Sequence, residues 1–140
     1  MAESVLLKKL ELPSCADSLQ EALEVMEEIA NQIGLSSDGS EELAIALTEA
    51  LNNAIFHGNG GVHEVPVMVY FEQVGDHLQV QVEDRGSGFD PDLVPDPRTE
   101  ENIYKTSGRG ILMMQIMVDE VRFNFSQQGT EVILMKSIKI

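Results

Sequence analysis

The chain has 140 residues, of which 43% are hydrophobic, and a formal net charge of −15 from 24 acidic and 9 basic side chains. This composition excludes a disordered chain, favours one domain over residues 1–140, and argues against a nucleic-acid-binding protein, which needs a basic surface. Cys15 is the single cysteine, no apolar run approaches the roughly 18 residues that span a membrane, and no leader opens the chain, so we expect a cytoplasmic protein without membrane contact.

The N-terminal part of the chain predicts a strand followed by a helix. Residues 4–12, SVLLKKLEL, have the composition of a strand, and Pro13 ends it. Apolar residues then recur at helical spacing: Leu19, Ala22, Leu23, Met26, Ile29, Ala30 and Ile33. Ser18 with Glu21 predicts a capping box at the start of this helix, and Gly34 is suited to its end.

A second helix follows the polar turn SSDGS, with Asp38 or Ser40 expected as its cap, and runs through residues 46–57. Apolar residues share the face that would join the core: Leu43, Leu47, Ala50, Leu51 and Ala54. The opposite face carries a different set: Glu49, Asn52, Asn53 and Phe56.

This second face is either a solvated surface or a binding site. Two asparagines in succession are poor helix formers, and Phe56 among polar groups argues against open water. Glu49 and Asn53 project side by side because they lie one turn apart. Magnesium prefers hard oxygen ligands such as the Asn53 amide, and Glu49 is placed to accept a proton from an attacking hydroxyl or water.

Two strands are predicted next, around residues 65–73 and over residues 77–84. Alternation along the second strand points Asp84 inward, where a carboxylate suits the exocyclic amine of adenine. Gly86 and Gly88 follow at a spacing that lets a flat ligand lie against the backbone. A calcium loop is excluded, since it would need oxygen-bearing side chains at these two positions, whereas a plain turn ending the strand stays open.

The remaining chain predicts a loop, a short helix and a hairpin. Residues 90–107 contain three prolines and no clear period, which predicts a long loop of the kind that forms a lid. Gly108 and Gly110 directly precede or open a helix of about residues 109–118, whose first N–H groups can bind an anion. Neither a Rossmann fingerprint nor a P-loop is present. Two strands joined near residues 126–130 close the chain.

Positive charge is concentrated in the same region of the chain. Four of the nine cationic side chains lie between residues 85 and 109: Arg85, Arg98, Lys105 and Arg109. This placement is either chance clustering or an anion site. The element order β-α-α-β-β-loop-α-β-β predicts an α+β two-layer sandwich with one mixed, largely antiparallel sheet and helices on one face.

Four motifs, taken in order, resemble the four boxes of the Bergerat-fold (GHKL) ATPases. They are E-x-x-x-N-A at residues 49–54, D-x-G-x-G at residues 84–88, G-x-G at residues 108–110 and G-T at residues 129–130. The likeness covers nearly the whole chain and implies adenine on Asp84, Mg²⁺ on Asn53 and a triphosphate under a mobile lid. It implies Glu49 as the catalytic base. The ATP-binding residues that it implies are Asn52, Asn53, His57, Asp84, Gly86, Gly88, Lys105, Ser107, Gly108, Arg109, Gly110 and Thr130.

Within this superfamily, a free-standing domain with TEALNNAIFHG and SGRGILMM is most similar to the anti-sigma-factor serine kinases. Members of that family phosphorylate a serine on a small STAS-domain anti-anti-sigma protein, otherwise sequester a sigma factor, and usually form homodimers. Some members carry an arginine just before the lid glycines, whereas here Lys105 and Arg109 flank Gly108. Two alternatives stay open: an ATP-binding module that binds a partner without kinase activity, and a detached histidine-kinase ATPase domain.

Overall fold

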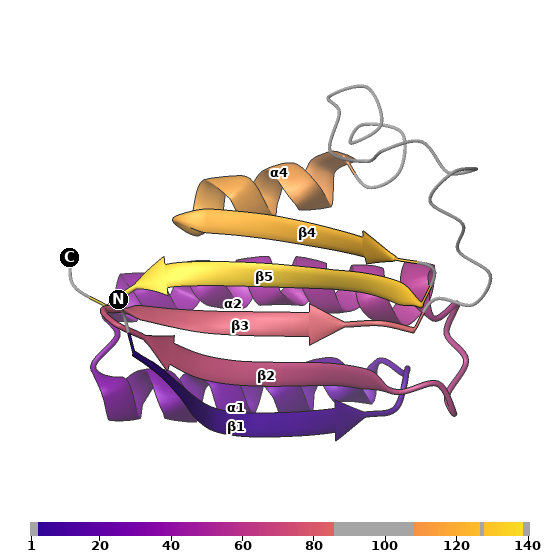
Figure 1. Ribbon diagram of the computed structural model, residues 1–140, viewed down its shortest axis with the longest axis horizontal. Coiled ribbons are helices and arrows are strands. Elements are labelled where there is room, and N and C mark those ends of the chain that lie inside the picture. The colour runs from indigo at the N-terminus through magenta and orange to yellow at the C-terminus, as the bar shows by residue number, and fades with distance from the viewer. Residues whose placement is uncertain (1–2, 86–107, 127, 139–140) are drawn as a thin grey trace.

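The computed structural model describes residues 3–85, 108–126 and 128–138 as a sheet covered on one face by helices (Figure 1). The elements in chain order are β1 (Ser4–Leu12), α1 (Asp17–Ile33), α2 (Ser37–Asn52), η1 (Asn53–Gly58), β2 (Val67–Val74), β3 (His77–Glu83), α4 (Gly108–Met117), β4 (Glu120–Ser126) and β5 (Gly129–Ser137). The five strands are ordered β1-β2-β3-β5-β4, and all four pairings are antiparallel. The expected two-layer sandwich is confirmed, with a sheet that is antiparallel throughout these strands.

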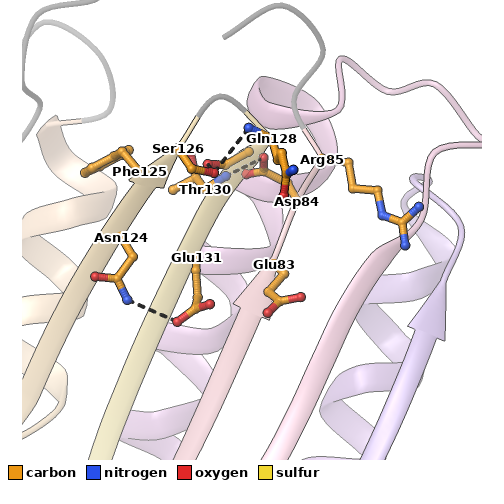
Figure 2. A pocket seen from close by; sticks show the side chains of 10 residues that line it. Glu83, Asp84, Arg85, Asn124, Phe125, Ser126, Gln128, Thr130 and Glu131 are labelled. Atoms are coloured by element: carbon orange, nitrogen blue, oxygen red, sulfur yellow. Dashed lines mark hydrogen bonds between the residues drawn. The ribbon is translucent and has the colours of Figure 1, made fainter. Parts of the chain in front are cut away.

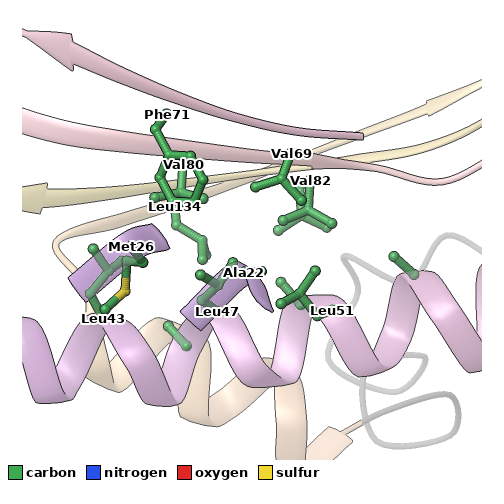
Figure 3. Packing of buried hydrophobic residues seen from close by; sticks show 14 of the residues in the cluster. Ala22, Met26, Leu43, Leu47, Leu51, Val69, Phe71, Val80, Val82 and Leu134 are labelled. Atoms are coloured by element: carbon green, nitrogen blue, oxygen red, sulfur yellow. The ribbon is translucent and has the colours of Figure 1, made fainter. Parts of the chain in front are cut away.

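The core lies between the sheet and the helices (Figure 3). Alternate residues of the central strands point toward the helices and are fully buried, among them Phe71, Val80 and Leu134. Leu47 and Leu51 of α2 pack against them from the helical layer. The alternating apolar residues of the strands and the apolar faces of the helices are buried in this one core. The strands and helices predicted from these patterns therefore form, with bounds within a few residues of those expected.

The two helix starts differ from the sequence expectation. Helix α1 has Ala16 at its N-cap and no side-chain cap. Ser18 lies inside the first turn, where its Oγ donates a hydrogen bond to the carbonyl oxygen of Pro13 at 2.6 Å, so the expected capping box is wrong. Gly34 ends the helix as expected, with a φ of 84°.

Helix α2 begins earlier than expected. Ser36 is its N-cap, and its Oγ accepts a hydrogen bond from the Gly39 N–H at 2.9 Å. The expected caps Asp38 and Ser40 are therefore wrong. Several residues of this polar turn are suited to capping. Leu35, which is buried in the core directly before Ser36, favours the earliest of them because it fixes where the chain enters the helix.

The second helix changes geometry at Asn53. One regular helix was expected over residues 46–57, but the α-helix ends at Asn52 and continues as the π-helix η1. The Asn59 N–H donates to the carbonyl oxygen of Ala54 at 2.9 Å, which is the five-residue spacing of a π turn. Segments of this type are rare and occur frequently at functional sites.

Helix α4 joins the core through Ile111 and Met114, and Lys136 of β5 adds a polar link to it. Its Nζ donates a hydrogen bond to the Met117 carbonyl oxygen at 2.8 Å, at the C-terminal end of α4, and approaches Glu42 of α2 at 3.3 Å. A cation at a helix C-terminus is favoured by the carbonyl groups exposed there. One side chain thus joins β5, α2 and α4.

The outer strands of the sheet are β1 and β4. The pairing of β1 with β2 is interrupted by an irregularity between Leu6 and Lys8, where the register shifts by one residue. None of the helices within residues 3–85 and 108–138 is both long and apolar enough to cross a membrane.

Candidate functional site

Three segments meet where β3 ends, β5 begins and η1 ends, at the right-hand edge of Figure 1. Asp84, the first residue after β3, forms two hydrogen bonds with Thr130 of β5. Its N–H donates to the Thr130 carbonyl oxygen at 2.9 Å, and its Oδ1 accepts from the Thr130 N–H at 3.1 Å (Figure 2). Two residues that the sequence placed in separate motifs are therefore in direct contact.

Gly58, the last residue of η1, lies directly against the Asp84 carboxylate. A Cβ atom on Gly58 would stand 2.3 Å from both Cγ and Oδ2 of Asp84, closer than real Cβ contacts come. Gly58 does not have a positive φ, so the position requires glycine for space and not for backbone conformation. Because η1 belongs to the helical layer, this contact confirms that Asp84 points inward.

Gly129 makes a similar close approach from β5. A Cβ atom there would lie 2.1 Å from the Asp84 carbonyl oxygen, and the φ of 147° is itself one that other residues rarely adopt. Asp84 is thus enclosed by two main-chain surfaces, one from η1 and one from β5. Such enclosure fixes the direction in which its carboxylate is presented.

Asn59 joins this site to the segments that precede α1 and β2, and the sequence motifs did not include it. Its Oδ1 accepts a hydrogen bond from the Arg85 N–H at 2.8 Å. Its Nδ2 donates to Ser14 Oγ at 2.9 Å and to the carbonyl oxygens of Val65 and Pro66 at 3.3 and 3.2 Å. The residue is only 5% exposed, so the amide is buried and satisfied at both ends.

A hollow of about 610 Å³ opens at the ends of β3, β4 and β5. Asp84 and Thr130 line it, together with Glu83, Asn124 and Glu131, whose side chains lie on the face of the sheet away from the helices (Figure 2). Its size lies within the range of small-molecule sites. Glu49, Asn52, Asn53 and His57 are not among its lining residues.

The expected catalytic residues lie on α2 and η1. The Asn53 N–H donates to the carbonyl oxygens of Glu49 and Ala50, which confirms that Glu49 and Asn53 stand one turn apart. The side chains of Glu49, Asn52 and Asn53 are half-buried, and those of Phe56 and His57 are exposed. Because Phe56 is 46% exposed, the expectation that it keeps this face away from open water is wrong. The half-buried oxygen donors of Glu49, Asn52 and Asn53 fit a magnesium ion held partly by phosphates. The roles of Glu49 and Asn53 stay predictions.

The remaining residues of the predicted site divide into two groups. Gly108 and Gly110 form the first turn of α4, as expected. Gly86, Gly88, Lys105 and Ser107 lie outside the described residues, as does the predicted lid at residues 90–107, and the Arg109 side chain is not described either. Within the described residues, no group of three or more His, Cys, Asp or Glu side chains is arranged to hold a metal ion.

The sequence is similar to those of known protein kinases. The profile of the histidine kinase-like ATPase domain family matches residues 12–136. Serine-protein kinase RsbW of Bacillus velezensis is 32% identical over 114 residues, which cover 77% of this chain and 71% of that protein. The RsbW kinase of Oceanobacillus iheyensis is 28% identical over 116 residues, covering 79% and 73% of the two chains.

Solved structures share the fold. The RsbU and RsbW domains of Rv1364c from Mycobacterium tuberculosis align with a TM-score of 0.69 at 20% identity, over 94% of this chain. This chain spans 33%, about a third, of that protein. The SiaB–SiaC complex from Pseudomonas aeruginosa contains a chain that aligns with a TM-score of 0.66 at 14% identity, over 93% of this chain and 89% of the other.

Proposed function

Because this chain belongs to the histidine kinase-like ATPase domain family and has RsbW serine-protein kinases among its relatives, we propose that it is an ATP-dependent protein serine kinase and anti-sigma factor. The observation that carries the proposal is the position of Asp84. Its carboxylate is held between Thr130 of β5 and Gly58 of the helical layer. Helix α2, which carries Glu49, continues into η1 with Asn53, and η1 ends at Gly58 beside Asp84.

Asp84 would recognise the adenine base. Its carboxylate accepts a hydrogen bond from the exocyclic amine, and the lack of a side chain on Gly58 leaves the carboxylate the space that it occupies. Thr130 fixes the orientation of the carboxylate through its N–H. Guanine presents an acceptor at the same position, so the arrangement favours adenine.

Asn53 would hold the magnesium ion through its amide oxygen, with ATP phosphates and water as the other ligands. The ion, when bound, neutralises charge on the phosphates. The first turn of α4, which begins at Gly108, would direct N–H groups toward the triphosphate. Lys105 and Arg109 are the cations proposed to contact the γ-phosphate.

Glu49 would act as the general base. It accepts the proton of a serine hydroxyl of the partner, the serine oxygen bonds to the γ-phosphorus, and the bond to the β-phosphate oxygen breaks to release ADP. A positioned carboxylate assists this step because the serine hydroxyl has a high pKa. Glu49 is half-buried one turn before Asn53, and this position suits the role.

The proposed substrate is a small STAS-domain anti-anti-sigma protein, and the proposed second partner is a sigma factor. Support comes from the RsbW relatives and from SiaB, a protein of this fold that was solved in complex with another protein, SiaC. We further propose that the protein acts as a homodimer in the cytoplasm, where ATP and sigma factors are found.

Transfer from γ-labelled ATP tests this function directly. The purified protein is incubated with labelled Mg-ATP and small STAS-domain proteins from the same organism, and we expect acid-stable label on a serine of one of them. Label that is lost in acid would indicate phosphohistidine and the histidine-kinase alternative. ATP binding without transfer to any partner would favour a binding module that lacks kinase activity.

A further inference from the structure

We infer that Asn59 is a positioning residue for nucleobase recognition, which holds the main chain at Arg85 so that the Asp84 carboxylate keeps its place. The inference rests on the proposed function, because it concerns the same nucleotide site. Asn59 is not proposed to touch the nucleotide. It acts through the peptide group that joins Asp84 to Arg85.

Gly58 and Asn59, two consecutive residues at the end of η1, contact the side chain before this peptide group and its N–H. Gly58 lies against the Asp84 carboxylate, and Asn59 Oδ1 accepts a hydrogen bond from the Arg85 N–H at 2.8 Å. On β5, the Thr130 N–H donates to Asp84 Oδ1 at 3.1 Å. The Thr130 N–H thus holds the carboxylate itself, and Asn59 holds the main chain at the next residue, Arg85.

The other end of the Asn59 amide is anchored in the protein interior. Nδ2 donates to Ser14 Oγ and to the carbonyl oxygens of Val65 and Pro66, which lie before α1 and before β2. Ser14 is itself 2% exposed and donates to the Val65 carbonyl oxygen. Because the donors of Asn59 are satisfied by the buried Ser14 and by two partly buried carbonyl groups, the direction of its Oδ1 toward Arg85 is held from the other side.

Only asparagine meets both demands at this length. Aspartate would supply the acceptor for Arg85 but lacks donors for the three acceptors on the other side. Alanine would leave the Arg85 N–H, the Ser14 Oγ and the carbonyl oxygens of Val65 and Pro66 without these bonds. The Asp84 carboxylate would then keep its bond to Thr130, but the main chain that follows Asp84 would lose its attachment to η1.

The experiment compares Asn59→Ala with Ser14→Ala as a matched control. Ser14→Ala removes one of the interior bonds of Asn59 but leaves the bond to Arg85. Binding of Mg-ATP and Mg-GTP is measured by calorimetry, and the melting temperature without nucleotide is measured for each variant. The ratio of the two affinities reports on base recognition, and the melting temperature reports on stability.

We expect both variants to melt at lower temperature, whereas only Asn59→Ala loses base recognition. Its affinity for Mg-ATP should fall about tenfold with little change for Mg-GTP, because the loss acts through the adenine-binding carboxylate. Ser14→Ala should keep the wild-type ratio. A folded Asn59→Ala that retains this ratio, or a Ser14→Ala that loses it equally, would overturn the inference.

A measurement on the wild type covers the case in which Asn59→Ala does not fold. Amide exchange at Arg85 requires its bond to Asn59 to open, so Mg-ATP should slow this exchange and Mg-GTP should not. Unchanged exchange at Arg85 under saturating Mg-ATP would contradict the positioning role.

The failure of this inference differs from a failure of the proposed function. If the wild type does not bind Mg-ATP, or if Asp84→Asn binds it as the wild type does, the nucleotide site itself is wrong. If Asp84→Asn loses Mg-ATP while Asn59→Ala keeps its affinity and base preference, only the role of Asn59 is wrong.

Discussion

At the scale of single residues, the contact between Gly58 and Asp84 makes the sharpest demand on the sequence. The two residues are far apart along the chain and have different origins, one at the end of a helix and the other at the end of a strand. The carboxylate occupies the volume that a side chain at position 58 would need. A single methyl group added at position 58 would therefore displace the Asp84 carboxylate and test its role in binding.

Gly58→Ala should weaken Mg-ATP binding by roughly tenfold to a hundredfold, because the new methyl group displaces the Asp84 carboxylate from its position. Calorimetry on the folded variant measures this change. Gly34→Ala is the matched control: it strains a φ of 84° in a position with nothing within 4 Å, so it should lower stability and leave affinity unchanged. Equal affinity of Gly58→Ala and wild type would show that the carboxylate does not bind the base.

Glu49→Gln should lower the rate of phosphoryl transfer by about 10²–10⁴-fold, because the amide cannot accept a proton. Affinity for Mg-ATP should change little, since the base acts mainly in the transition state. Glu41→Gln, an exposed position two turns earlier on α2, serves as the control and should transfer phosphate at the wild-type rate. Near-normal transfer by Glu49→Gln would mean that another group accepts the proton of the serine hydroxyl.

At the scale of elements, the largely buried Lys136 side chain adds to the attachment that α4 has through its core residues Ile111 and Met114. Lys136→Met keeps the length of the side chain but removes the bond to the Met117 carbonyl oxygen and the ion pair with Glu42. We expect a loss of about 1–2 kcal/mol in the free energy of unfolding, mostly from the carbonyl group, measured by urea denaturation.

Glu42→Gln separates the two contributions of Lys136. It weakens the partly exposed ion pair while keeping the bond between Lys136 and Met117, so it should cost less than about 1 kcal/mol. If Glu42→Gln destabilises the protein as much as Lys136→Met does, the helix end contributes little and the ion pair is the main link.

The elements themselves could be predicted because their signals are local. Alternation in β3 and helical spacing in α1 and α2 follow directly from burial on one face, and the structure confirms them. The N-terminal caps of the helices could not be predicted, because nearby residues such as Ser36 and Asp38 have similar capping ability and packing elsewhere decides between them. The C-terminal Gly34 could be predicted, since its positive φ favours glycine. The π-helical end of the second helix has no sequence period of its own.

The candidate site shows the same division. Asp84 and Thr130 could be named from short motifs, since glycines and carboxylates at fixed spacing carry a chemical meaning. Asn59 could not, because its partners Ser14 and Arg85 lie 45 and 26 residues away in the sequence. An asparagine among glycines is also what an ordinary turn contains.

At the scale of the whole molecule, nucleotide binding should stabilise the fold. A ligand at a hundred times its dissociation constant adds about 2.7 kcal/mol when it binds the folded state alone. For a chain of this size, Mg-ATP at that concentration should raise the melting temperature by roughly 5–10 °C. Scanning calorimetry measures the shift, with Mg-GTP as the comparison.

Asp84→Asn should abolish most of this shift at the same nucleotide concentration, because its amide can present a donor to the adenine amine. The melting temperature without nucleotide is recorded first, so that a general loss of stability is separated from lost binding. A full ATP-dependent shift in Asp84→Asn would place adenine elsewhere on the protein.

The register irregularity in β1 has a consequence for how the protein behaves at high concentration. An open sheet has outer strands whose backbone groups can pair with another molecule, which leads to aggregation. In β1 the regular pairing pattern is broken between Leu6 and Lys8, and two lysines, Lys8 and Lys9, follow at the break. An irregular edge that carries two lysines is a poor template for a further strand, so this short interruption disfavours the addition of another copy at β1.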